Sequence, residues 1–290
     1  MLLFILSAAV IHFIRKNIYT SSEQLLLSLE AYKDYNVIDV VDMNVQAPSS
    51  FFVTDDEAVY ICDYVDSTIN VYKSGEPVQE IEINIEYPVY FLDIYVANEN
   101  EIYVLDELNT IYKIDSFGNV SEKLKIPEID SNLFYAPDRI EFEDSKLTVT
   151  FVNNKKYFFE NGVLTPIEKS TEDVYENDGP TIVNHISKKK IKIPGSGNIL
   201  TSKVADERSD DDFVVEYFSV AEENGDDMTD RKLYFIKNDR IHSELDLKYS
   251  EYFRPHKSYM ITEDDVVYQM FVTEDKLEIY RSIPHKFEGG

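Results

Sequence analysis

Cysteine is nearly absent from this chain, since Cys62 is the only one among 290 residues. A single cysteine excludes an internal disulfide. Cys62 lies in the run AVYICDYV, where no histidine or basic residue is nearby to lower the pKa of its thiol. We therefore expect Cys62 to be a small buried hydrophobic side chain rather than a reactive nucleophile.

Motifs of common enzyme classes are also missing from the sequence. The histidines show neither H-x-H nor H-E-x-x-H spacing, so a zinc site is not indicated; they are His12, His185, His242, His256 and His285. The sequence contains no G-x-S-x-G elbow and no Walker loop, and PGSGN at 194–198 is interpreted as a turn because no helix pattern follows it. We assign no catalytic residue and predict that the protein is not an enzyme.

Basic residues are scarce relative to acidic ones. The chain has 28 Lys and Arg against 55 Asp and Glu, which gives a formal net charge of −27. Such a chain repels phosphate backbones and anionic bilayers, so nucleic-acid partners are excluded. The acidic surface has two interpretations, general solubility or attraction of a cation or basic partner. The one basic cluster, SKKKIKIP at 187–194, is typical of an edge strand protected by charge, or else of a docking spot for an acidic partner.

The N-terminus carries an apolar run but no preceding Lys or Arg. Residues 2–14 are mostly apolar, a length typical of a signal peptide and short for a membrane span, and Arg15 and Lys16 follow them. We expect residues 1–20 to be an export signal or membrane anchor, with a truncated start or a short helix as alternatives. The protein would then be extracytoplasmic, secreted or membrane-anchored, and would contact the membrane only through this segment. No cysteine flanks the run, so a lipid anchor is not supported.

A repeat of about 43 residues organises the rest of the chain. Val59, Tyr60, Ile61 and Asp63 lie 43 residues before Ile102, Tyr103, Val104 and Asp106. Gly75, Gly118 and Gly162 follow at intervals of 43 and 44 residues, where a turn between strands favours positive φ. Alternating apolar and polar residues around these positions predict paired strands. A period of this length with four short strands is typical of a propeller blade.

The repeat predicts an all-β, six-bladed β-propeller over residues 36–283, followed by a tail at 284–290. The last unit lacks a fourth strand, so we expect the N-terminal segment at 36–45 to pair with the strand around 277–281 and close the ring. The Ser/Thr cap signal TSSE precedes residues that we expect to form a short helix, at 21–35. The fourth unit, at about 181–207, is the most divergent. We expect a monomer.

The best-preserved unit resembles an NHL repeat. The residues that carry the resemblance are Tyr103, Val104, Asp106, Asn109, Ile111, Asp115 and Gly118, and in the preceding unit Tyr60, Ile61, Asp63, Ile69 and Gly75. Later units keep the strand spacing but lose the Asp, the Asn and often the Gly. The resemblance implies a six-bladed propeller of the type found in bacterial exported proteins, in which propellers mostly act as binding modules. It also implies that Asp63 and Asp106 are structural and bond backbone amides between strands.

Acidic loops between strands are the candidate recognition surface. They comprise Asp55, Asp56 and Glu57 in the first unit, Asp226, Asp227 and Asp230 on a long loop, and Glu263, Asp264 and Asp265 in the last unit. None matches a calcium-hand loop, so we expect no cofactor, and weak calcium binding by the 226–230 loop is the alternative. We assign no metal-ligating residues.

The predicted function is a non-enzymatic binding or scaffold module that recognises a protein or cell-envelope ligand through one propeller face, where loops carry function on a rigid scaffold. The alternative is a calcium-dependent propeller hydrolase or lactonase, which needs carboxylates and amides that converge at the central channel. Three or more such side chains at the axis would favour the enzyme. A channel mouth lined by Tyr and Phe would favour the binding module.

Overall fold

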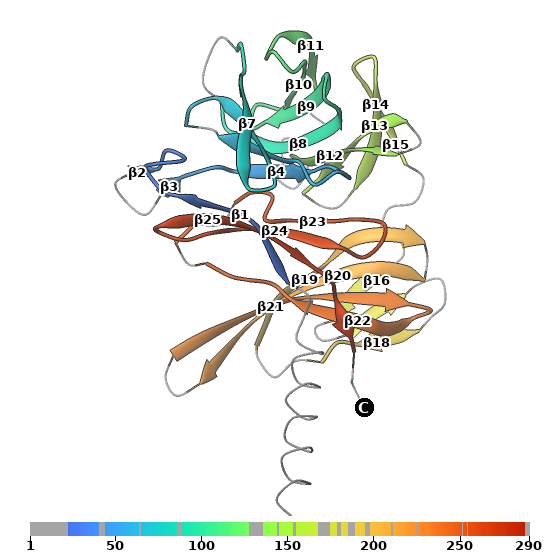
Figure 1. The fold of residues 1–290 in the computed structure, drawn as a ribbon. Helices are drawn as coiled ribbons and strands as arrows, with labels where there is room; N and C mark the ends of the chain where they lie inside the picture. The colour runs from blue at the N-terminus through green and yellow to red at the C-terminus, as the bar shows by residue number, and fades with distance from the viewer. Residues whose placement is uncertain are drawn as a thin grey trace, which may run out of the picture.

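The described part of the protein, in a computed structural model, is built of β-strands (Figure 1). The structure describes residues 23–40, 44–63, 65–85, 89–127, 136–143, 145–152, 155–167, 175–178, 181–184, 189–194, 198–209, 211–223, 226–250, 252–253 and 255–287. No helix occurs in these ranges, and none of their elements is a helix long and apolar enough to cross a membrane. The expected export signal at 1–20 lies outside them and stays a prediction.

Within the described ranges, five antiparallel sheets have four or five strands, and we number them as blades in chain order. Blade 1 contains β4 (Ser50–Val53), β5 (Val59–Asp63), β6 (Thr68–Lys73) and β7 (Glu76–Glu82). Blade 2 contains β8 (Phe91–Asn98), β9 (Glu101–Asp106), β10 (Thr110–Ile114) and β11 (Val120–Lys125). Blade 3 contains β12 (Pro137–Glu143), β13 (Lys146–Phe151), β14 (Lys156–Glu160) and β15 (Val163–Pro166).

The last two blades each include a strand from one end of the described chain. Blade 4 contains β19 (Asn198–Ser209), β20 (Asp212–Glu223), β21 (Asp226–Lys237) and β22 (Arg240–Asp246), extended by β26 (His285–Lys286). Blade 5 contains β23 (Tyr259–Ile261), β24 (Val267–Val272) and β25 (Lys276–Ser282), completed by β1 (Gln24–Glu30). A separate hairpin joins β2 (Ile38–Val40) to β3 (Asn44–Gln46).

Hydrophobic clusters join the sheets face to face. Blade 1 packs on blade 2 through residues such as Ile69 and Ile94, and blade 2 packs on blade 3 through residues such as Ile111 and Val149. Blade 4 packs on blade 5, which in turn packs on blade 1. Apolar residues of the inner strands bury the faces of these blades against their neighbours, whereas the outer strands β7, β11 and β15 are mostly exposed. This arrangement of sequential sheets is a β-propeller, as the 43-residue repeat predicts.

The blade count differs from the expected six. The first strands of five sheets line one axial cavity, so five blades are counted around the axis. The segment expected to form a further blade, at about 181–207, is divided between two sheets. Residues 198–207 belong to β19 of blade 4, and the earlier part contributes β17 (Thr181–Asn184) and β18 (Lys190–Lys192) to a three-stranded sheet with β16 (Tyr175–Asp178). Its strands are only three or four residues long, and it packs on blade 4 through Ile182 and Ile191. β18 is an edge strand with Lys190 and Lys192 exposed, as expected of a strand protected by charge.

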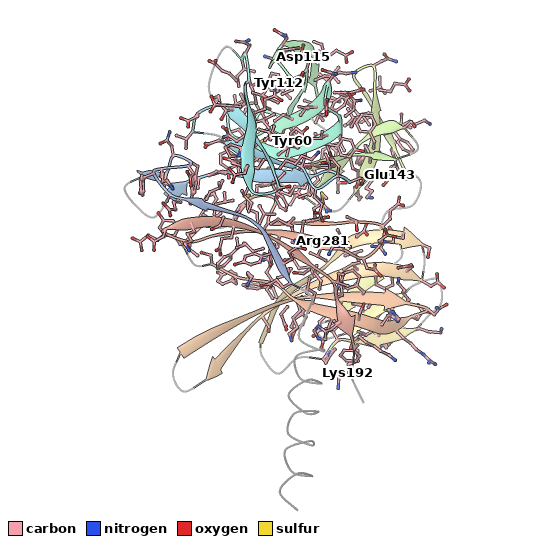
Figure 2. All side chains as sticks on the ribbon, viewed as in Figure 1. Tyr60, Tyr112, Asp115, Glu143, Lys192 and Arg281 are labelled. Atoms are coloured by element: carbon pink, nitrogen blue, oxygen red, sulfur yellow. The ribbon has the colours of Figure 1, made fainter. Side chains whose placement is uncertain are left out.

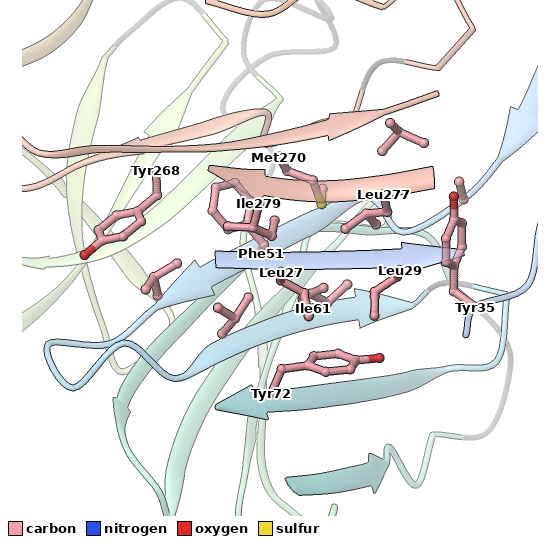
Figure 3. Close-up of a cluster of buried hydrophobic side chains, with 14 of the residues drawn as sticks. Leu27, Leu29, Tyr35, Phe51, Ile61, Tyr72, Tyr268, Met270, Leu277 and Ile279 are labelled. Atoms are coloured by element: carbon pink, nitrogen blue, oxygen red, sulfur yellow. The ribbon is translucent and has the colours of Figure 1, made fainter. Parts of the chain in front are cut away.

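Ring closure by an N-terminal strand is confirmed, but the predicted segment was wrong. The strand that pairs with β25 is β1, with Leu29 opposite Leu277, whereas residues 36–45 contribute to the β2–β3 hairpin. The helix expected at 21–35 is also wrong, because its central residues form β1. Figure 3 shows Leu27 and Leu29 of β1 beside Ile61 of blade 1 and Ile279 of blade 5. Burial of alternate leucines between two sheets outweighs the helix propensity of this segment.

The two aspartates of the repeat have the structural role that the resemblance implies. Asp106 is fully buried, and its carboxylate accepts hydrogen bonds from the Thr110 backbone N–H at 2.7 Å and from the Tyr112 hydroxyl at 3.0 Å. Asp63 is also buried and accepts from the Val65 N–H at 3.0 Å. Cys62 beside it is fully buried, and burial raises the pKa of its thiol, as expected of an inert side chain.

The repeat glycines occupy left-handed backbone, and one of them has a further steric requirement. Gly75, Gly118 and Gly162 have φ of 80°, 78° and 78°. A Cβ on Gly118 would lie 1.8 Å from the Glu82 carbonyl oxygen of blade 1, whereas a Cβ on Gly162 would meet nothing within 4 Å. Gly118 therefore permits a close approach between blades 1 and 2 that no other residue allows.

We expect Gly118→Ala to lower the free energy of unfolding more than its matched control Gly162→Ala. Both variants carry the same left-handed strain, about 1–2 kcal/mol. Only Gly118→Ala adds the clash with Glu82, which we expect to contribute about 1–3 kcal/mol more. Urea unfolding of both variants measures the difference, and equal losses would show that the blades separate without strain at this contact.

Candidate functional site

A short segment before β23 connects the blades at the axis, and we call residues 255–258 the axial segment. His256 Nε2 lies 3.1 Å from the Asp138 carboxylate of blade 3. The backbone N–H of Lys257 donates to the Ser49 carbonyl, next to blade 1, at 3.1 Å. The Ser258 hydroxyl accepts from Arg231 of blade 4 at 2.9 Å. Three consecutive residues of one segment thus contact three different blades.

The central contact of this segment is the ion pair between Lys257 and Asp93 of blade 2. Their charged atoms are 2.7 Å apart, and the side chains are 9% and 1% exposed. Asp93 also accepts hydrogen bonds from the backbone N–H of Ile94 at 2.8 Å and of Ile140 in blade 3 at 2.9 Å. The Ser50 hydroxyl of blade 1 donates to it at 3.3 Å. A carboxylate buried this deeply is stable only because each of these partners compensates its lost hydration.

A second buried ion pair lies within blade 4 and is bonded to blade 5 through Tyr259. Arg231 donates to Glu216 at 2.6 Å, and both side chains are 4% exposed. The Tyr259 hydroxyl of β23 donates to the other oxygen of Glu216 at 2.7 Å, and the Arg231 guanidinium lies 5.3 Å from the Tyr259 ring centre. Burial and the charge of Glu216 raise the pKa of Tyr259, so this phenol stays protonated as a donor.

The axial segment borders a cavity of about 1580 Å³ at the centre of the ring. The walls are formed by the first strands of the five blades, through residues that include Phe52, Tyr95, Arg139, Asp206 and Tyr259. Typical small-molecule pockets have volumes of about 300–1,000 Å³. The cavity is therefore large enough for a segment of another macromolecule.

One wall of this cavity is aromatic. Phe52 and Tyr95 lie with ring centres 5.1 Å apart, and Tyr95 lies 5.1 Å from Phe142. These three rings come from blades 1, 2 and 3 and line the cavity together. Contiguous partly exposed rings offer a large apolar surface with defined geometry. Aromatic rings at the channel are thus among the features that the sequence-based expectation named for a binding module.

Two of the three predicted acidic loops lie at the cavity. Residues 54–58 and residues 262–266 form two turns of the same type. In each turn the threonine N–H donates to the carbonyl of the residue four positions later, and the N–H of that residue donates to the threonine hydroxyl. The lining residues include Asp55, Asp56, Glu57, Glu263 and Asp264. The loops expected between strands are hairpin tips that join the first and second strands of blades 1 and 5, and blade packing brings them to one cavity.

The third predicted loop differs from the other two because its acidic residues lie in a strand. Asp226, Asp227 and Asp230 belong to β21, in the long hairpin of β20 and β21, with Asp226 paired to Glu223. The expectation of a loop there was wrong for these residues, because the two strands continue to the end of the hairpin. Their side chains lie outside the described residues, so weak calcium binding there stays a prediction.

Several acidic side chains at the cavity are already paired. Asp56 lies 2.7 Å from Lys73, and the hydrogen bond from Lys73 lowers the pKa of Asp56 to about 2. Glu57 lies 3.5 Å from Arg281, whose position between the two halves of the molecule is visible in Figure 2. Asp265 lies 2.5 Å from Arg208 and 2.9 Å from Lys237, so it holds the 262–266 turn against blade 4. Burial raises the pKa of Asp265, but these cations outweigh burial and leave the pKa lowered.

The remaining carboxylates do not form a metal centre in the part of the chain that the structure describes, where no group of three or more His, Cys, Asp or Glu side chains could hold an ion. Glu141 in the cavity wall lies 2.8 Å from Lys156. Burial raises the pKa of Glu141, but the charges of Lys156 and Arg139 outweigh burial and lower it. In the inner wall of the cavity, Asp93 and Glu141 are held in ion pairs with Lys257 and Lys156.

Sequence reasoning missed the residues at the axis, namely Asp93, Arg139, Glu216, Arg231 and Lys257. A signal existed for Asp93, because FLDIYV places a carboxylate within an otherwise apolar inner strand. Its partner Lys257 is 164 positions away in the sequence, and no local pattern connects the two.

The fold and the axial cavity place this chain in the β-propeller class. No protein-family model and no curated protein matches the sequence. Among solved structures, virginiamycin B lyase from Staphylococcus aureus is similar, with 14% identity over 90% of this chain and 99% of that chain and a TM-score of 0.44. The WD40 propeller domain of Doa1 has 12% identity over 89% of this chain and 97% of that chain, with a TM-score of 0.45. BamB from Moraxella catarrhalis has 9% identity over 92% of this chain and 98% of that chain, with a TM-score of 0.38. Likeness of this degree carries no argument about activity or ligand.

The His256 contact gives a pH-dependent contribution to stability. Burial lowers the pKa of His256, but the hydrogen bond and charge of Asp138 outweigh burial and raise the pKa above its usual value near 6.5. Because the folded pKa is the higher one, the contribution is fully present below the unfolded pKa and is lost as the pH rises through the folded pKa.

We expect His256→Gln to destabilise the protein more at about pH 5.5 than at about pH 8, because the contribution of the protonated imidazole is lost as the pH rises through the folded pKa. The difference in urea midpoint between wild type and variant, measured across this range, tests the contact. A difference that is constant with pH would contradict it. His285→Gln, which alters a contact to Glu244 outside the axis, is the matched control.

Proposed function

We propose that this protein is a non-enzymatic binding module that recognises a protein or cell-envelope ligand through its axial cavity. The observation that carries the proposal is the cavity of about 1580 Å³ with a wall of three aromatic rings from three blades. Its inner acids, Asp93 and Glu141, are engaged in ion pairs, which leaves them unsuited to act as a general base or a metal ligand. The ion pairs make the walls rigid, as a preformed binding site requires.

The ligand in this proposal is extracytoplasmic, in line with the export signal or anchor predicted at 1–20. The cavity volume favours an extended segment of a macromolecule over a small metabolite. The basic edge strand β18 has no part in the proposed site. Figure 2 shows Lys192 of this strand at the end of the molecule opposite Tyr60, which lines the cavity.

Selection of a random peptide display library on the full chain tests this proposal. Ala97 of β8 is exposed and lines the cavity, so Ala97→Trp narrows its entrance without removing a core contact. Val163 of β15 is 60% exposed, and Val163→Trp is the matched control. We expect selected peptides to bind wild type and Val163→Trp equally and to bind Ala97→Trp at least about tenfold more weakly.

Equal binding to all three proteins would place recognition elsewhere and overturn the proposal. The enzyme alternative predicts a different result. A calcium-dependent hydrolase would gain thermal stability with calcium and lose it with a chelator, because binding to the native state raises the melting midpoint. Chelator-sensitive turnover of ester or lactone substrates would establish that alternative. We expect an unchanged midpoint and no turnover.

A further inference from the structure

The cavity combines two features that together specify the chemistry of a ligand. One is an excess of negative charge at its entrance, and the other is a pair of unpartnered polar groups in its wall. The inference drawn from them rests on the proposed function, because it concerns the same cavity.

The negative charge is at the entrance and is not neutralised there. Among the described lining residues, the cations Lys73, Arg139, Lys156, Lys257 and Arg281 each pair with an acid. The exposed carboxylates of Asp55, Glu99, Glu263 and Asp264 also line the cavity, and none of them has an ion pair within the described ranges. A concave entrance lined by one sign of charge concentrates ligands of the opposite sign.

The polar groups belong to blade 3, where Arg139 of β12 and Thr150 of β13 are direct cross-strand partners. Both residues line the cavity. The Thr150 side chain is buried, at 2% exposure for the residue, and its hydroxyl has no hydrogen-bond partner among the described residues. Arg139 Nε has none either, although it lies 3.5 Å from the Asp138 carboxylate. Most buried polar atoms in native structures are paired, and these two unpaired donors lie at facing positions of the cavity wall, where an acceptor from a ligand would complete them.

The acceptor that fits is neutral. The charge of Arg139 is already balanced by Asp138, and its terminal nitrogen donates to the Ala205 carbonyl of blade 4 at 3.2 Å. What remains is a pair of donors, the Arg139 N–H and the Thr150 hydroxyl, which a backbone carbonyl oxygen satisfies without adding charge. An anionic ligand would also have to pass the acidic entrance.

We propose that the cavity takes a basic peptide segment. Its Lys or Arg side chains pair with Asp55, Glu99, Glu263 and Asp264 at the entrance, its apolar side chains contact the ring wall of Phe52, Tyr95 and Phe142, and one of its backbone carbonyls accepts from Arg139 and Thr150. The stems of Lys and Arg cover aromatic faces while their charged ends stay in water, so one peptide satisfies all three regions.

Fluorescence anisotropy with two short labelled peptides tests the charge requirement. One peptide alternates lysine and tyrosine, and the other alternates glutamate and tyrosine. We expect the lysine peptide to bind wild type at least about tenfold more tightly than the glutamate peptide. The double variant Asp55→Asn/Asp264→Asn should weaken the lysine peptide several-fold. The control Glu122→Gln/Glu160→Gln, which removes two exposed charges from β11 and β14, should leave affinity unchanged.

The variant Thr150→Val tests whether the Thr150 hydroxyl binds the peptide or only stabilises the fold. Removal of an unpartnered buried hydroxyl should raise the melting temperature, because the folded state no longer buries an unsatisfied group. The same change should weaken the lysine peptide about threefold to tenfold, since a bond made only in the complex is lost. The neighbouring Thr148→Val is the control, because Thr148 is buried in the same strand and its hydroxyl already donates to Lys146.

The contrary outcomes are distinct. Unchanged affinity of Thr150→Val would show that the Thr150 hydroxyl makes no hydrogen bond to the peptide. Similar affinity for both peptides would refute the basic-ligand proposal. If the lysine peptide fails while peptides from the display selection still depend on Ala97, the cavity is a binding site for another ligand class. If no peptide depends on Ala97, the proposed function itself has failed.

Discussion

The buried ion pair between Lys257 and Asp93 is the contact on which the arrangement of the ring depends. Lys257 belongs to the segment before β23, and Asp93 lies on the first strand of blade 2, where it also accepts from blades 1 and 3. A propeller of sequential sheets has local contacts within each blade and few between distant ones. The pair supplies such a contact across the axis, and it fixes one end of the cavity at the same time.

Much of this architecture could be predicted from the sequence, because it follows from local rules. The period of about 43 residues, the positive φ of Gly118 and the bracing role of Asp106 each depend on neighbours within one blade or the next. The misassigned closing strand shows the limit. The LLLSL stretch at 25–29 follows a cap signal and is typical of a helix. It forms a strand because it pairs and packs with Leu277 and Ile279 of β25, which are distant in the sequence. The blade number was overestimated because strands of three or four residues gave a repeat-like pattern without enough length to complete a blade.

The candidate site was predictable only in its outer part. Acidic hairpin tips at 54–58 and 262–266 were visible as runs of Asp and Glu, and the ring brings both to the cavity. The inner wall could not be inferred, since Phe52, Tyr95 and Phe142 each resemble ordinary core residues in their own strands. Their joint exposure follows from how three blades meet. An acidic entrance, an aromatic wall and unsatisfied donors in blade 3 are the features on which the proposed binding role depends. The inner acids Asp93 and Glu141 are held in ion pairs.

A double-mutant cycle on the axial pair tests the central claim most directly. Lys257→Met, Asp93→Asn and the double variant are unfolded in urea beside the wild type. Because either single change leaves a buried polar or charged group uncompensated, we expect Lys257→Met to lower the free energy of unfolding by about 3–5 kcal/mol. The double variant should lose less than the sum of the single losses, with a coupling of about 1–3 kcal/mol. Additive losses, within about 0.5 kcal/mol, would show that the two side chains do not hold the ring together.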